Sequence, residues 1–227
     1  MHYLTAAQVG DLASAIAGRY RALILTAAYA GLRAGELDAL RVEDLELGEL
    51  GGTITVTKSH SEVRGQLRVG TTKTGRRRVV TIPRFLSRML ADHVERYSDK
   101  FVFTAGEGGP IRHRSFARRH FDPAVAKARE IAKAHGREHE MIPEGLRCHD
   151  LRHTCAAILI ANGRHMEEVK AHLGHGSIRT TSDTYGHLFK DAQAAIADAL
   201  EETFKSSIRA VTAERRPRNE SAALRGV

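Results

Sequence analysis

The chain has 227 residues, of which 42% are hydrophobic, and this length and composition suit one globular domain with its own core. Its 35 Lys and Arg against 27 Asp and Glu give a formal net charge of +8, which fits a polyanionic partner such as nucleic acid, although a basic protein without such a partner would look the same. Neither a signal peptide nor an apolar stretch long enough to span a bilayer is visible, so we expect a cytoplasmic protein that does not enter a membrane.

The first part of the chain is predicted to be helical. The segment Thr5-Ala-Ala-Gln8 has the pattern of a capping box, which begins a helix over about residues 5–17. An apolar helix over about 19–30 follows, and its content of Ala, Leu and Ile is typical of a core helix. Gly31 breaks this helix, and a short helix over 34–40 comes next. The chain therefore begins with helices that supply part of the core.

Three stretches in the next part of the chain are predicted to be strands. Residues 53–57 alternate in polarity and are β-branched, and residues 66–70 and 78–82 have a similar character. The segment 72–75 is the turn between the last two strands, and Pro83 ends the third. We expect these strands to form one small three-stranded antiparallel sheet.

The rest of the chain is predicted to be helical, so the fold class is mostly α with a small sheet (α+β). Ser115 can cap a helix that runs to about residue 135. From residue 212 on, the chain is polar and basic and has no core pattern. We therefore expect one domain over 1–206 and a basic, disordered tail over 207–227. The helices are expected at about 84–97, 115–135, 149–162, 166–173, 177–184 and 190–206.

The residues that can carry chemistry gather between Cys148 and Leu188. His149 and Arg152 are three residues apart, so on a helix they share one face, while the apolar residues of that helix take another. This pair can present an acid or base and a fixed cation to one anion. Tyr185 follows in a segment rich in Thr and Ser, where we expect its hydroxyl to be reachable from solvent.

This stretch resembles the catalytic end of the tyrosine recombinases, the lambda-type phage integrase family. That family has a His-x-x-Arg motif, then Leu-Gly-His, and about ten residues later a tyrosine, which correspond here to residues 149–152, 173–175 and Tyr185. Upstream it has an arginine in a Gly-Leu-Arg-x-x-Glu-Leu context, here residues 31–37, and a lysine in a β-turn before a basic strand, here residues 72–83. The six family positions are filled in order by Arg33, Lys73, His149, Arg152, His175 and Tyr185.

Each of these motifs is common on its own. A lone His-x-x-Arg is usually a surface or helix-packing pair, a lysine in a turn is usually solvated, and a tyrosine is more often a half-buried core residue. Their joint order and local contexts, over about residues 5–205, argue against coincidence. The resemblance therefore covers nearly the whole chain.

The resemblance implies a group of anion-binding residues. Arg33 and Arg152 would bind the non-bridging oxygens of a DNA phosphodiester with forked, permanently charged donors. His175 would add a third donor, and such preorganised groups usually supply the largest share of the rate enhancement. Glu36 would orient a neighbouring basic group; equally, it could be an acid that complements the N-terminus of its helix.

The resemblance also implies a covalent mechanism. Tyr185 would attack the phosphorus, His149 would accept its proton, and Lys73 would protonate the departing 5′ oxygen. The resulting 3′-phosphotyrosyl link retains the energy of the phosphodiester, so rejoining would need no metal or other cofactor. His149 and His153 have the i,i+4 spacing of metal ligands, but no second ligand motif accompanies them, and we expect His153 to be structural.

Two groups of arginines are candidates for contacts with the DNA backbone. One group flanks the Lys73 turn, where a solvated face is the alternative, and the other follows residue 110. The seven candidates are Arg76, Arg77, Arg78, Arg112, Arg114, Arg118 and Arg119.

The expected function is that of a site-specific recombinase, a phage or mobile-element integrase of a bacterial host cell. Its partners would be double-stranded DNA attachment sites and further copies of the chain, assembled as a tetramer through the 190–206 helix; accessory DNA-bending proteins are compatible with this. Family members usually carry a further N-terminal domain, so the chain would be a fragment or a minimal integrase. Two alternatives stay open: a type IB topoisomerase-like nicking-closing enzyme, and a non-catalytic regulator with a helix–turn–helix over residues 169–185.

Overall fold

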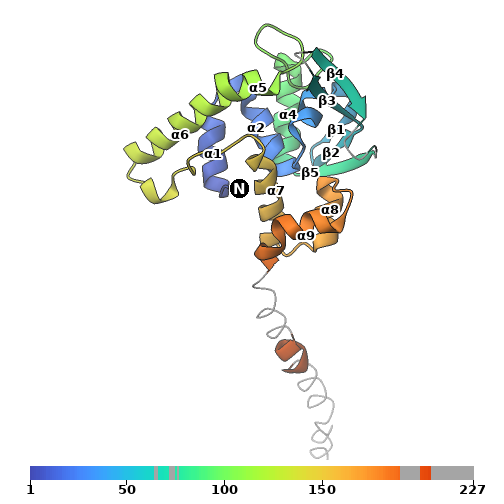
Figure 1. Cartoon of the computed structure of the whole chain (residues 1–227), viewed down its shortest axis with the longest axis vertical. Helices are drawn as coiled ribbons and strands as arrows, with labels where there is room; N and C mark the ends of the chain where they lie inside the picture. Colours follow the sequence, from blue (N-terminus) through green and yellow to red (C-terminus); the bar gives the residue numbers. More distant parts are fainter. Residues whose placement is uncertain (64–65, 72–74, 76, 190–199, 206–227) are drawn as a thin grey trace, which may run out of the picture. The chain divides into compact units, whose positions relative to one another are not determined.

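The computed structural model describes residues 1–63, 66–71, 75, 77–189 and 200–205 (Figure 1). The chain divides into two compact units, Met1–Tyr185 and Gly186–Val227, and the elements from α1 to α9 all belong to the first. In the second unit the described parts are a 3-10 helix, η4 (Gly186–Phe189), and the helical residues 200–205. The rest of the predicted 190–206 helix and the predicted tail lie outside the described residues, so the domain boundary at 206 stays a prediction.

The first unit is mostly helical, which confirms the predicted fold class. None of the described helices combines the length and the apolar character that crossing a bilayer requires. The observed bounds of α4 and α8 agree with the predicted ones to the residue. The helices are α1 (Ala6–Ala15), α2 (Gly18–Ala30), α3 (Ala34–Ala39), α4 (Arg84–Tyr97), α5 (His113–Phe116), α6 (Asp122–Ala134), α7 (Asp150–Ala161), α8 (Met166–Leu173) and α9 (Ile178–Tyr185).

The first helix, α1, begins with the predicted capping box. The Thr5 side chain accepts a hydrogen bond from the backbone N–H of Gln8, and the Gln8 side chain accepts one from the backbone N–H of Thr5. Helix α2 follows and is buried along most of its length, so it forms the centre of the unit. It ends at Gly31, whose φ of 65° is a left-handed conformation that glycine adopts without strain.

A three-stranded antiparallel sheet is present, as predicted, with the order β1 (Leu45–Gly48), β2 (Gly51–Val56), β5 (Arg78–Ile82). In its register Ile54 lies opposite Val80, and both side chains are completely buried. Helix α4 packs on β1 and β2. There the Ser87 hydroxyl accepts a hydrogen bond from the backbone N–H of Gly48 and donates one to its carbonyl.

The composition of that sheet differs from the prediction. Residues 66–71 form β4 (Gln66–Thr71), which pairs with β3 (Lys58–Val63) in a separate two-stranded sheet. Strand β4 is exposed along most of its length, so it has no apolar face to set against the core. The third place in the larger sheet belongs to β1, which forms a tight hairpin with β2, and the assignment of residues 66–70 to this sheet was therefore wrong.

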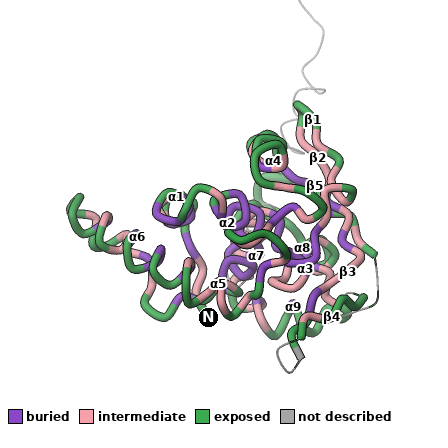
Figure 2. The backbone as a smooth tube through the Cα atoms, turned by 90° about the horizontal axis from the view of Figure 1, so that it is seen from above, coloured by how far each residue is buried: buried purple, intermediate pink, exposed green. Residues whose placement is uncertain are grey.

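The buried positions concentrate along the central helices (Figure 2). Helices α2 and α7 pack against each other, and α1 covers α2. The helix expected to start at a Ser115 cap instead begins at His113, with Arg112 as its N-cap residue. It continues through a π-helical segment, Ala117–Phe121, directly into α6, so Ser115 lies inside the helical run and does not cap it.

Candidate active site

Arg152 lies in the interior of α7 and is only 2% exposed. Its Nη1 donates to the carbonyl of Gly31, and its Nη2 donates to the carbonyl of Leu173 at 2.7 Å. Burial, followed by the nearby charge of Arg33, lowers the pKa of Arg152 to about 10. The guanidinium is therefore still charged at neutral pH, and two carbonyls from distant segments define its position.

Arg33 is the N-cap residue of α3, and its side chain reaches the same end of α8 as Arg152. Its Nη1 donates to Oε1 of Glu36 at 2.9 Å, and its Nη2 donates to the carbonyl of Gly174 at 3.1 Å. Its backbone N–H donates to Oε2 of Glu36 at 2.8 Å. The side chain is 20% exposed, so Arg33 is anchored within the protein and is still reachable from solvent.

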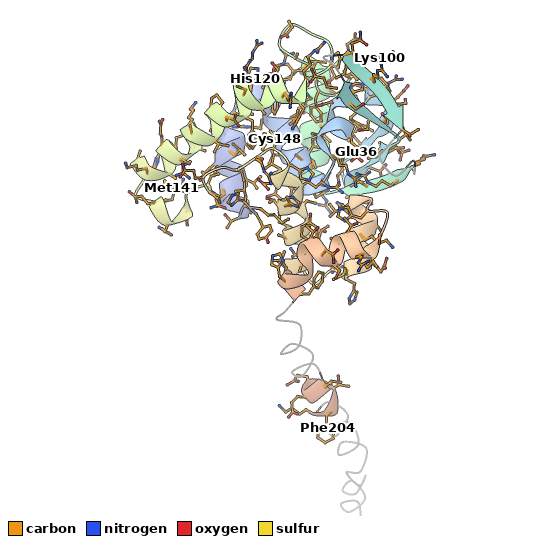
Figure 3. The ribbon with its side chains drawn as sticks, viewed as in Figure 1. Glu36, Lys100, His120, Met141, Cys148 and Phe204 are labelled. Carbon is orange, nitrogen blue, oxygen red and sulfur yellow. The ribbon has the colours of Figure 1, made fainter. Side chains whose placement is uncertain are left out.

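Glu36, labelled in Figure 3, is a buried carboxylate. It forms ion pairs with both Arg33 and Arg78. Arg78 donates to Oε1 from Nη1 at 2.9 Å and to Oε2 from Nη2 at 2.7 Å, while Arg33 shares Oε1. Burial alone would raise the pKa of Glu36, but the bonds and charges of Arg78 and Arg33 outweigh it, and the pKa lies below its ordinary value. Glu36 is therefore ionised.

The environment of Arg78 differs from the one expected for a phosphate-contacting residue. Its side chain is 11% exposed, its two terminal nitrogens bind Glu36, and its Nε donates to the carbonyl of His172 at 3.3 Å. Of its neighbours in the predicted arginine group, Arg77 is exposed, and Arg76 lies outside the described residues together with Lys73.

Three arginines from three segments meet at one helix end. The last carbonyls of α8 and of its C-cap residue, at positions 172, 173 and 174, accept hydrogen bonds from Arg78, Arg152 and Arg33 respectively. These carbonyls have no partner further along the helix, and they carry the partial negative charge of the helix dipole. The C-terminal end of α8 therefore organises the cationic part of the site.

His175 follows this helix end directly. Its Nδ1 shares a hydrogen bond with Oγ1 of Thr181 at 2.9 Å, and its ring stacks on that of Tyr185 with an interplanar angle of 7° and a centroid distance of 6.3 Å. Burial, and then the charge of Arg152, lowers the pKa of His175 to about 4. The imidazole is therefore neutral at physiological pH.

Tyr185 is the last residue of α9 and is only 1% exposed, so the expectation of an accessible hydroxyl was wrong. Thr181 and Tyr185 are four residues apart, and both fall on the inner face of α9, while the polar residues around them face outward. Burial raises the pKa of Tyr185 to about 12, so the phenol is neutral.

The histidine beside the Tyr185 hydroxyl is His153, which sequence reasoning regarded as structural. Its Nδ1 lies 2.7 Å from the phenol oxygen, and the two groups share a hydrogen bond. The ring of His149 stands edge-on to that of His153, with a centroid distance of 4.8 Å. The four-residue spacing of these histidines put them on one helix face, and this signal could have linked His153 to the tyrosine.

The histidines near the Tyr185 phenol have lowered pKa values. Burial, and then the charge of His149, lowers the pKa of His153 to about 4. Burial, and then the charge of Arg152, also lowers the pKa of His149. Within the described residues no group of three or more His, Cys, Asp or Glu side chains has an arrangement that could bind a metal ion.

The remaining candidate DNA contacts lie in and beside α5 and the π-helical segment that follows it. All four are exposed, and Arg112 also forms an ion pair with Glu62 of β3 at 3.4 Å. The structure thus brings Arg33, Arg152, His149, His175 and Tyr185 into one region. The four candidate DNA contacts are Arg112, Arg114, Arg118 and Arg119.

Comparison with known proteins gives consistent matches. The sequence profile described as "Phage integrase family" matches residues 2–192. The ICEBs1 integrase of Bacillus subtilis is 35% identical over 178 residues, which cover 76% of this chain and 46% of that protein. The integrase of Mycobacterium phage L5 is 29% identical over 211 residues, which cover 90% of this chain and 53% of that protein. The chain spans about half the length of these two relatives.

Solved structures agree on the fold. A structure of the Tn1549 transposon integrase in complex with circular intermediate DNA matches with a TM-score of 0.72 and 22% identity, over 88% of this chain and 67% of that one. The family profile covers most of the sequence, and a relative that is 35% identical is an integrase. The chain therefore belongs to the phage integrase family.

Proposed function

We propose that this chain is the catalytic part of a site-specific DNA recombinase, an integrase of a phage or another mobile element. The observation that carries the proposal is the convergence of Arg33, Arg152, His175 and Tyr185 from separate segments around the end of α8. Integrases among the relatives, and the DNA-bound Tn1549 integrase among the structural neighbours, support the same class of reaction.

The cationic part of the site suits the transition state of phosphodiester cleavage. Attack on a DNA phosphate places additional charge on the phosphoryl oxygens, and Arg33 and Arg152 carry permanent positive charge on planar, forked donors. Their hydrogen bonds to Gly31, Leu173 and Gly174 define the guanidinium positions before DNA arrives. Donors that need no reorganisation are the most effective stabilisers of developing charge.

In the proposed reaction the Tyr185 oxygen forms a bond to phosphorus, and the bond from phosphorus to the 5′ oxygen breaks. The phenol proton passes to a neutral imidazole, for which we propose His149, and Lys73 supplies the proton for the 5′ oxygen. Because Tyr185 is almost fully buried, its hydroxyl must become accessible first. We propose that DNA binding shifts α9 and separates the hydroxyl from His153.

The proposed partners follow from the proposed recombinase activity. Double-stranded attachment-site DNA would be the substrate, and strand exchange between two sites would use a tetramer of the chain, assembled through the 190–206 segment in the bacterial cytoplasm.

The regulator alternative is less well supported, because Tyr185 and Thr181 of its supposed recognition helix are buried and cannot contact base edges. The topoisomerase-like alternative shares the chemistry and differs in the outcome of the second step.

The test uses a library of nicked duplexes of randomised sequence, in which the nick traps a covalent intermediate. The wild-type chain should form an adduct that survives denaturation, and EDTA should not prevent it. The Tyr185→Phe variant should retain DNA binding, since every cation is still present, and should form no adduct. Adduct in Tyr185→Phe would move the nucleophile to another tyrosine. DNA binding by the wild type without adduct from any duplex would favour the regulator.

A further inference from the structure

We infer that Arg78 is a positioning residue for strand cleavage: it sets the Arg33 guanidinium through Glu36, and it fixes the end of α8 from which His175 projects. The inference rests on the proposed function. It replaces the expectation that Arg78 contacts phosphate, because every nitrogen of its guanidinium donates to a protein group.

The first contact that carries the inference is the one with Glu36. Arg78 bonds both carboxylate oxygens, and Arg33 bonds the oxygen that faces Arg78 Nη1. Glu36 is 1% exposed, so its charge has to be matched by protein groups and cannot be left to water. Without Arg78, the carboxylate would have Arg33 as its remaining guanidinium partner. Arg33 would then be drawn toward both oxygens and away from the Gly174 carbonyl and the substrate phosphate.

The second contact is with the end of α8. Arg78 Nε donates to the His172 carbonyl, and the Arg78 side chain packs against Gly174. A Cβ atom at Gly174 would lie 2.8 Å from Arg78 Cδ and 3.0 Å from its Nε and Nη1. Gly174 also has a φ of 68°, so both its backbone conformation and its packing against Arg78 require glycine. Arg78 therefore defines the path of the backbone that leads into His175.

The position of Arg78 in the sheet also links it to the segment that contains Lys73. Arg78 is the first residue of β5, where it lies opposite Val56, and the segment that contains Lys73 immediately precedes this strand. The Arg78 side chain thus connects three parts of the site. It lies on the strand that follows the proposed general acid, it bonds the carboxylate that also bonds Arg33, and it bonds the end of α8 that precedes His175. These three parts are far apart in the sequence, and Arg78 makes their positions interdependent.

The geometry requires arginine and not only a positive charge. Three donors in a rigid plane bond two carboxylate oxygens and one carbonyl, whereas a lysine at this position has a single nitrogen on a flexible stem. The Arg78→Lys variant therefore keeps the charge that Glu36 needs while it removes the fork. This substitution separates a positioning role from simple charge compensation.

The test compares cleavage of two substrates by single-turnover adduct formation. One is a duplex that the wild type cleaves in the library experiment, and the other is the same duplex with a neutral methylphosphonate at the cleaved position. Arg33→Ala should lose less on the methylphosphonate, because that substrate lacks the charge that Arg33 neutralises. If Arg78 acts through Arg33, Arg78→Lys should lose about ten- to a hundredfold on the phosphodiester, and clearly less on the methylphosphonate.

Controls separate positioning from a general loss of structure. Arg88 is exposed on α4, so Arg88→Lys should cleave both substrates at the wild-type rate. A double-mutant cycle supplies the second readout: because Arg78 acts partly through Glu36, Arg78→Lys should lose clearly less in the Glu36→Gln background than in the wild type, and the loss that remains should come from its bond to the His172 carbonyl.

Three results would overturn the inference. Arg78→Lys could cleave the phosphodiester at the wild-type rate, or it could lose the same factor on both substrates, or its effect could add fully to that of Glu36→Gln. Failure of the proposed function looks different, because the wild-type chain itself would then form no adduct with any duplex. In that case the inference would fall together with the function on which it rests.

Discussion

Arg152 and Tyr185 are almost equally buried in the same unit, but they are held in place by bonds of different number and charge. Arg152 donates charged hydrogen bonds to two carbonyls, and beside it Arg33 and Arg78 are joined by an ionised Glu36. Among the described residues, Tyr185 shares one hydrogen bond, with a neutral His153. Charged hydrogen bonds contribute about 1.5 to 3 kcal/mol each, and a neutral one about 1 kcal/mol.

This difference indicates which part of the site can move. Displacing Arg152 or Arg78 would leave buried charge or buried carbonyls without partners, which is costly. Displacing Tyr185 breaks its neutral hydrogen bond with His153 and exposes an aromatic ring. We therefore expect the anion-binding part to be preorganised and the nucleophile to be the part that DNA rearranges.

Substitution of Arg152 should have the largest effect. Arg152→Ala removes a donor to the transition state, so adduct formation should fall by about a thousandfold. It also leaves the carbonyls of Gly31 and Leu173 unbonded, so the free energy of unfolding should fall by about 2 to 4 kcal/mol. Single-turnover assays and urea unfolding measure the two effects.

The matched variant for Arg152 is Arg152→Lys, which keeps the charge and loses the fork. It should recover part of the stability and little of the cleavage rate, because one nitrogen cannot serve both carbonyls and a phosphate. Adduct formation by Arg152→Ala within about tenfold of the wild type would show that this residue has only a structural role.

The two histidines near Tyr185 should differ in effect. His149→Phe removes the proposed base, so adduct formation should fall by about a hundredfold or more. His153→Phe removes only the group that bonds the buried phenol, so the rate should change by less than about tenfold and the free energy of unfolding by about 1 kcal/mol. A loss of about a hundredfold in His153→Phe, with His149→Phe near the wild-type rate, would transfer the base role to His153.

The two parts of the site also differ in how well the sequence predicted them. The anion-binding residues stand in motifs of fixed local spacing, and the helices that carry them were predicted nearly to the residue. The partner of Arg78 was not predictable, because Glu36 lies 42 positions away and the pairing depends on how β5 meets α3. The same holds for the burial of Tyr185, since its polar neighbours on α9 face outward and its partner His153 is 32 positions away.

The strands show a similar limit. Strand propensity identified residues 66–70 correctly as extended, but it did not indicate which strands pair. The larger sheet packs against the core, so its strands need a buried face. Strand β2 has one, with Ile54 and Val56, and β4 has none. Tertiary packing, and not local preference, decided the order of the strands.

The dependence of cleavage on pH should reflect the environment of His149. Burial, and then the charge of Arg152, lowers its pKa, so the imidazole stays neutral and able to accept a proton at lower pH than an ordinary histidine. The second-order rate constant reports the free protein, and its acidic limb should therefore fall with a midpoint below the ordinary value of about 6.5. Measurement at subsaturating DNA tests this, and a midpoint above that ordinary value would contradict it.

Two buried acids of α3 provide the smallest and last comparison. Glu36 and Asp38 are two residues apart and are 1% and 5% exposed. Glu36 is paired with two arginines, and its pKa is lowered. Asp38 has no such compensation, and burial raises its pKa from 3.8 to about 8. At neutral pH the folded chain therefore contains an ionised Glu36 and a protonated Asp38.

The raised pKa of Asp38 makes folding take up a proton between about pH 4 and pH 8, so its contribution to stability is lost as the pH rises through this range. The Asp38→Asn variant carries an amide at this position, and an amide does not titrate. The substitution should therefore change stability little near pH 4 and should raise the free energy of unfolding near pH 8. Glu36→Gln should have the opposite sign at neutral pH, because it removes an ionised partner of Arg33 and Arg78. Urea unfolding across this range measures both, and a gain for Asp38→Asn that is equal at the two ends of the range would show that Asp38 does not retain its proton in the folded chain.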